Sequence, residues 1–131
     1  MSPDLKYLLF SVILTFVQML VAATGANRAV GLPTLAGNRE GLPEIKGWAG
    51  RAKRAHLNMV ENMVLFAALV LIAAAAGKAN AMTAMGAVIF FWGRAAYAVI
   101  YVAGIAWLRT AAWFVSVIGM VMIAIELLKA M

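Results

Sequence analysis

The sequence predicts an all-α integral membrane protein built as a four-helix bundle. It has 131 residues, of which 66% are hydrophobic and only 12% are charged, a balance far from that of soluble globular domains. Four apolar runs lie near residues 5–24, 55–76, 82–103 and 108–128. Each is close to the roughly 20 residues that a helix needs to cross a hydrocarbon core about 30 Å thick. We therefore expect a single transmembrane domain over residues 1–131.

The first apolar run has two interpretations, because its end, VAATGA, resembles the cleavage site of a signal peptide. Asp4 beside Lys6, however, leaves little net charge before the run. The run is also longer than the roughly 7–15 residues of a signal-peptide apolar region. We expect it to be retained as a membrane span.

The connections between the runs indicate how the helices are arranged. GKANA separates the second and third runs, with Gly77 at a helix stop, and Gly104 is expected to end the third. Such short joints favour antiparallel neighbours. The one long connection, residues 25–54, contains two of the three prolines and is expected to form an ordered or semi-ordered loop.

The net charge of +6 is expected to set membrane topology and not to bind nucleic acid, because the basic residues lie between apolar runs and form no soluble basic patch. Seven of them fall on one side of the predicted membrane and three on the other, which places the 1–2 and 3–4 loops in the cytoplasm and both termini outside. The seven are Arg28, Arg39, Lys46, Arg51, Lys53, Arg54 and Arg109, and the three are Lys6, Lys78 and Lys129.

The available side chains limit the chemistry of the chain. Cysteine is absent and His56 is the only histidine, so we expect no metal site, no disulfide and no histidine-based triad. Any thiol chemistry needs a thiol from another molecule.

The stretch RAKRAHLNMVEN, residues 51–62, begins the second span with polar groups on one side. At about 100° per residue, five of these side chains lie within little more than a quarter turn of the helix. They must face protein or water, since an amide or carboxylate presented to lipid is costly. The five are Arg51, Arg54, Asn58, Glu61 and Asn62.

The third span carries a second polar stripe of Arg94, Tyr97 and Tyr101, spaced three and four residues apart and so on one helix face. An arginine inside a membrane span indicates a functional site. Glu61 could simply neutralise Arg94 and fix the helix register. The guanidinium groups nevertheless outnumber the carboxylates, so we expect an anionic guest whose carboxylates bind guanidinium forks, with Glu61 left for its positive group.

The motif RAKRAHLNMVEN and the later stretch RAAYAVIYVAGIAWLRT resemble the MAPEG family, the membrane-associated proteins in eicosanoid and glutathione metabolism, in particular its bacterial-type microsomal glutathione transferases. The resemblance covers residues 51 to about 119, and the first helix and long loop match in layout only. It implies a homotrimer in the membrane, here the bacterial inner membrane, with glutathione bound between subunits near the cytoplasmic face.

The resemblance also assigns roles to individual residues. Arg109 is similar in placement to the arginine that stabilises the glutathione thiolate, and Thr110 stands where some members have a serine that donates to the sulfur. Glu61 would receive the amino group of the glutamyl part. Leu57 departs from the pattern, because some members have an arginine there. The other implied glutathione-binding positions are Arg51, Arg54, Asn58, Arg94, Tyr97, Tyr101 and Arg28.

These residues predict a glutathione-dependent transferase or peroxidase that acts on lipophilic small molecules dissolved among membrane lipids. A nearby guanidinium favours a thiolate, which is the nucleophilic form of a thiol. Two alternatives remain from other classes: a non-catalytic lipid-binding or scaffold protein of the same fold, and a small transporter or channel subunit. Another low-molecular-weight thiol could also take the place of glutathione.

Overall fold

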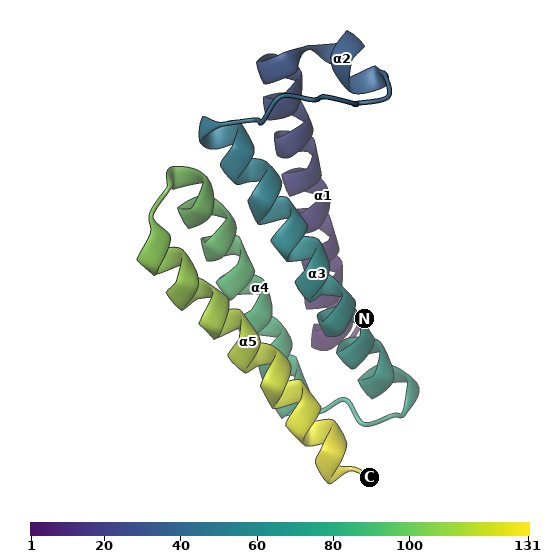
Figure 1. Cartoon of the computed structure of the whole chain (residues 1–131). Coiled ribbons are helices and arrows are strands. Elements are labelled where there is room, and N and C mark those ends of the chain that lie inside the picture. The colour runs from purple at the N-terminus through teal and green to yellow at the C-terminus, as the bar shows by residue number, and fades with distance from the viewer.

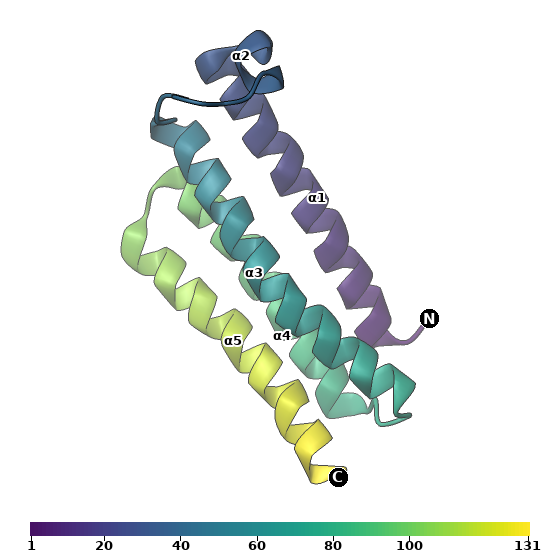
Figure 2. The same cartoon turned by 45° about the vertical axis from the view of Figure 1, so that its right-hand side comes forward.

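The computed structural model describes residues 1–131 as four long helices and one short one, with no strands (Figure 1). The long helices are α1 (Pro3–Val30), α3 (Gly47–Ala75), α4 (Ala81–Ala103) and α5 (Ala106–Lys129), and α2 (Leu32–Ala36) caps one end. All four long helices are long and apolar enough to cross a membrane, as the sequence predicts. Both termini lie at the end of the bundle opposite α2 (Figures 1 and 2).

The segment 25–54 is mostly helical, so the expectation of a loop there is wrong for most of its length. α1 continues to Val30 and stops at Gly31, whose φ of 85° favours glycine. α3 begins at Gly47, well before the apolar run, because Ala49, Ala52 and Ala55 give its first turns a buried face. Apart from Gly31, only residues 37–46 of this segment are non-helical.

The buried face of α1 consists of small and polar residues. Asp4, Ser11, Gln18 and Gly25 are its buried residues, and their spacing of seven is that of a helix–helix seam. At Gly25 the seam is tight, because an added Cβ would lie 2.8 Å from the Cβ of Ala49 on α3. Small residues at such a seam let membrane helices approach closely.

The joint between α3 and α4 is fixed by side-chain capping that the apolar pattern did not reveal. Asn80 is the N-cap of α4 and forms a capping box with Thr83. The Asn80 amide also donates to Glu126 Oε2 at 3.0 Å, which ties the start of α4 to the end of α5. Gly104 ends α4 in the left-handed region, with φ of 87°, as expected from the sequence.

α4 and α5 pack through glycines. An added Cβ at Gly86 would lie 2.6 Å from the Gly119 carbonyl oxygen, and one at Gly93 would lie 2.9 Å from the Ser116 nitrogen. These close contacts hold α5 against the glycine-containing face of α4, and the small-residue segment 81–87 is part of that face. As a result, Arg109 near the start of α5 is placed beside the end of α4.

Candidate functional site

Arg94 lies inside the bundle and is fully buried, at 0% exposure. Its Nη2 donates to Asn58 Oδ1 at 2.9 Å, and its Nε lies 3.3 Å from the sulfur of Met59. The guanidinium carbon also lies 4.1 Å from the centre of the Tyr97 ring, a cation–π distance. Nη1 has no hydrogen-bond partner. Arg94 is thus a buried cation held by neutral groups, with one donor left free.

Tyr101, two turns further along α4, joins groups from three helices. Its hydroxyl accepts a hydrogen bond from Arg54 Nε of α3 at 3.2 Å. The Arg109 guanidinium of α5 lies over its ring, 4.4 Å from the ring centre. Tyr101 is 8% exposed, so packing fixes its orientation. It therefore positions two arginines that are distant in sequence.

A cavity of about 240 Å³ lies among these groups, between α3, α4 and α5. It is smaller than most drug-sized pockets, but its walls combine amide, phenol, guanidinium and hydroxyl groups. Five of its six lining residues were predicted as site residues from the sequence. The lining consists of Asn58, Tyr97, Tyr101, Arg109, Thr110 and Trp113.

Trp113 is the cavity residue that sequence reasoning missed, because a tryptophan in an apolar span is usually a packing or interfacial residue. It follows Arg109 by four residues, so the two side chains share a face of α5. This spacing of four was the feature of the sequence that could have identified Trp113 as a site residue. Met59 was missed in the same way, although its sulfur contacts Arg94 Nε.

Arg51 is held by a structural contact. Its Nε donates to the carbonyl oxygen of Val102 at 3.0 Å, in the last turn of α4, where helix carbonyls lack intrahelical partners and favour a cation. Arg51 therefore ties the start of α3 to the end of α4. It does not line the 240 Å³ cavity.

Glu61 and Arg28 are both exposed, and neither lines this cavity. The alternative in which Glu61 neutralises Arg94 is not found, because the only ion pair in the chain joins Lys129 and Glu126. Asn58, one turn before Glu61 on α3, supplies the oxygen that Arg94 binds. Glu61 thus has no ion-pair partner within the chain.

Thr110 lies at the cavity, but its hydroxyl donates to the Ala106 carbonyl oxygen within α5, at 3.3 Å. Donation to a sulfur atom would require the hydroxyl to leave this bond. Of the two residues predicted to act on the sulfur, Arg109 is therefore better positioned than Thr110 to do so without losing an existing hydrogen bond.

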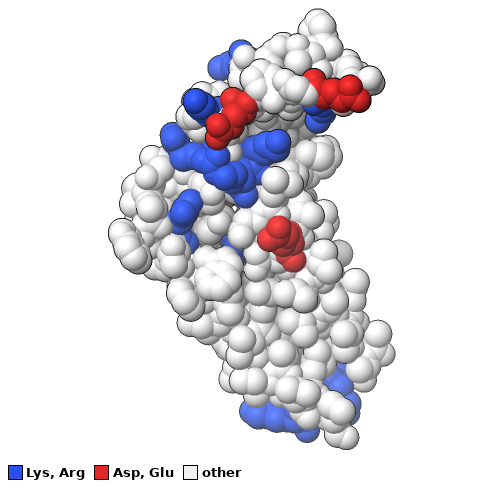
Figure 3. All heavy atoms as spheres, in the orientation of Figure 1, with Lys and Arg blue, Asp and Glu red and all other residues white.

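The site has a strong excess of positive charge. None of Arg51, Arg54, Arg94 and Arg109 forms an ion pair. On the face seen in Figure 3, most lysines and arginines gather toward the end of the bundle that carries α2 and the start of α3, with acidic residues beside them, and a smaller basic group lies at the opposite end. Unpaired guanidiniums around a small polar cavity favour an anionic ligand.

The fold and the site define an α-helical integral membrane protein with a cationic cavity between three of its helices. Residues 5–129 match the MAPEG family, and the chain belongs to this family. The match confirms the resemblance carried by the two motifs and extends it to α1 and to the segment before α3. The family includes glutathione transferases and peroxidases. A search of curated proteins found no match.

Proposed function

We propose that the protein binds glutathione in the cationic cavity and uses its thiolate to conjugate or reduce lipophilic electrophiles. One observation carries this proposal: Arg109 lines the cavity, and Arg54 and Arg94, which do not line it, contact its wall residues Tyr101 and Tyr97. None of the three arginines has a carboxylate partner. Glutathione offers two carboxylates and a thiol, which match the charge of the site. It is also the co-substrate that the family generally uses.

The carboxylates of glutathione would be held by Arg94 and Arg54. Arg94 Nη1 is buried and has no partner, so it would donate to a carboxylate without breaking an existing hydrogen bond once neighbouring side chains move aside. Arg54 is exposed and bonded only through Nε to Tyr101, so its two terminal nitrogens are available. A bound carboxylate would also compensate the buried charge of Arg94, which costs free energy when it has no counter-ion.

We further propose that the working unit is a homotrimer. Glu61 and Arg28 are exposed in the single subunit and line no part of the cavity. The cavity is also smaller than most small-molecule sites. A neighbouring subunit that covered this face would enlarge the site and allow Glu61 to receive the amino group of the glutamyl part.

Arg109 is the group proposed to act on the sulfur. It lies in the first turn of α5, where the helix dipole also favours negative charge. Lowering the pKa of the bound thiol by about one favours the thiolate by about 1.4 kcal/mol. Asn58 of α3 and Trp113 of α5, which both line the cavity, would hold the tripeptide in place.

The two reactions differ in what the thiolate attacks. In conjugation, the thiolate forms a C–S bond as halide leaves an electrophilic carbon, and the thiol proton is released to solvent. In reduction, one glutathione attacks the hydroperoxide oxygen and the O–O bond breaks to give an alcohol. A second glutathione then forms the disulfide, and water is the other product. Both electrophiles would reach the site from the lipid.

The side of the membrane on which the site lies is also a proposal. Seven of the ten lysines and arginines outside the third span lie at the end of the bundle that carries α2 or in the segments next to it. Because translocation disfavours short basic segments, this end would face the bacterial cytoplasm. There it would meet a water-soluble thiol.

Turnover in detergent tests the function. We expect the purified protein to accelerate the reaction of glutathione with chlorodinitrobenzene, or the reduction of cumene hydroperoxide, by more than about tenfold over the rate without protein. Folded protein that binds glutathione but is silent with both electrophiles would overturn the catalytic proposal and favour a scaffold role. Folded protein that does not bind glutathione would overturn the site as well.

A further inference from the structure

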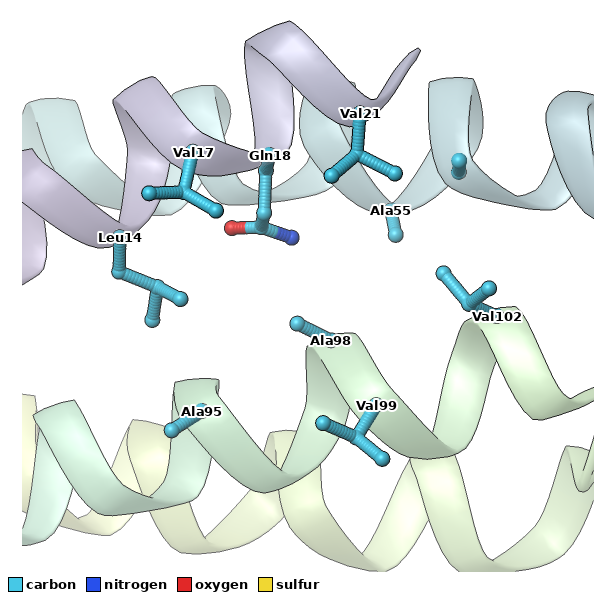
Figure 4. A pocket seen from close by; sticks show the side chains of 10 residues that line it. Leu14, Val17, Gln18, Val21, Ala55, Ala95, Ala98, Val99 and Val102 are labelled. Carbon is cyan, nitrogen blue, oxygen red and sulfur yellow. The ribbon is translucent and has the colours of Figure 1, made fainter. Parts of the chain in front are cut away.

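A second and larger cavity lies on a different face of α4. It has a volume of about 440 Å³ and lies between α1, α3 and α4, within the size range of small-molecule sites. Figure 4 shows the side chains of α1 and α4 pointing toward each other across it. Ala55 lines this cavity and also packs with Tyr97 and Tyr101 of the cationic site, so it lies between the two cavities.

The cavity has a buried floor and an exposed rim. Its floor includes Ala55 at 1% exposure and Ala98 at 9%. Its rim includes Val17 at 48% and Val99 at 72%, which belong to the apolar outer surface of α1 and α4. A molecule dissolved in the bilayer can therefore enter laterally. The alanine floor leaves room that larger side chains would fill.

Gln18 is the only polar residue among the ten that line the cavity. Its side chain points into the cavity in Figure 4, it is only 8% exposed, and its Oε1 has no hydrogen-bond partner. A buried amide oxygen without a donor is unfavourable, and in a membrane span lipid tails cannot supply one. The unpaired oxygen therefore points to a ligand that brings a donor.

We propose that this cavity is a binding site for a membrane-soluble alcohol, whose hydroxyl donates to Gln18 Oε1 and whose apolar body packs on the alanine floor. A hydroxyl suits this amide because it can donate to the unpaired oxygen, which only accepts. The ligand should be neutral because the remaining walls are apolar and would penalise a charge. Three helices of one subunit enclose the site, which makes a small molecule a better occupant than a helix of a second copy.

The depth of Gln18 narrows the class of alcohol. It lies six residues before the end of the apolar run at residue 24, or about 9 Å along the helix, so the amide lies inside the hydrocarbon layer. A hydroxyl in the middle of an apolar chain matches this depth, and a terminal headgroup does not. In the apolar layer such a hydroxyl has few competing partners.

Photolabelling in detergent tests this site. The probes are a long-chain secondary alcohol with a diazirine and the hydrocarbon of the same length with the same diazirine. We expect the alcohol to label the α1 and α4 peptides of the cavity about threefold to tenfold more than the hydrocarbon, the value of one net hydrogen bond. In Gln18→Leu, a substitution of similar volume, both probes should label equally. This variant should also melt at a higher temperature than wild type without ligand.

Two tryptophan variants separate this site from general lipid contact. Val99→Trp fills the rim and should reduce labelling by both probes, whereas Val115→Trp, at an exposed position of α5, should leave it unchanged. Equal labelling of wild type by the two probes would overturn the proposal. A Gln18→Leu protein that keeps the preference for the alcohol would also overturn it. If wild type shows no preference and Gln18→Leu loses its oligomeric state, the proposal is likewise wrong, because Gln18 would then contact a second subunit.

Discussion

Replacing Arg109 by alanine is expected to lower glutathione turnover about 10-fold to 100-fold, since one guanidinium beside the sulfur can lower the thiol pKa by about one to two. Arg109 lies over the Tyr101 ring and lines the cationic cavity, so it is placed to stabilise the thiolate. Glutathione affinity should fall much less, because the carboxylates are held elsewhere. The ultraviolet absorbance of the thiolate, measured with saturating glutathione at neutral pH, checks the cause.

Arg109→Lys is the matched control for this prediction. It keeps the positive charge but lacks the planar group that stacks on Tyr101, so it should retain part of the thiolate absorbance. An Arg109→Ala protein with wild-type absorbance and turnover would remove Arg109 from the reaction. Loss of turnover with unchanged absorbance would instead place Arg109 in binding of the electrophile.

Replacing Arg94 by methionine is expected to have opposite effects on stability and on binding. Without glutathione, the variant should be more stable than wild type, because the change removes a fully buried cation that has no counter-ion. Replacing buried charges by apolar groups of similar size is neutral or stabilising by about 1–4 kcal/mol. Asn58 would keep a partner, because its Oδ1 also accepts from Asn62 at 3.3 Å.

The effect of glutathione on the melting temperature should further distinguish wild type from Arg94→Met. At 100 times its dissociation constant, a ligand stabilises the protein it binds by about 2.7 kcal/mol, so wild type should melt at a clearly higher temperature with glutathione. Arg94→Met should show almost no such increase. Thermal unfolding with and without glutathione measures both effects. A variant that melts lower than wild type without ligand yet gains the same stabilisation from glutathione would show that Arg94 has only a structural role.

The sequence was sufficient to predict the four spans and the two polar stripes, because helical periodicity places residues three and four apart on one face. Arg94, Tyr97 and Tyr101 are buried together on α4 for this reason. Periodicity does not say which groups bond across helices. It therefore left open whether Arg94 pairs with Glu61, and the structure shows Asn58 as its partner.

Other features depended on tertiary packing and could not be predicted. Arg51 belongs to the same stripe as Arg54 by sequence, but the position of the last turn of α4 directs it to the Val102 carbonyl. The helical start of α3 depends on tertiary burial of its alanines, including the close approach of Ala49 to Gly25 of α1. The unpaired oxygen of Gln18 is visible only when α1, α3 and α4 are placed around it.

The cationic site is tested most directly by comparing the binding of glutathione with that of its diethyl ester, by calorimetric titration of the wild-type protein in detergent. The ester keeps the thiol and the amino group but has no carboxylates for Arg54 and Arg94. Charge-assisted hydrogen bonds contribute about 1.5–3 kcal/mol each, so we expect the ester to bind at least about 100-fold more weakly. Equal affinity for the two molecules would contradict carboxylate binding by these arginines.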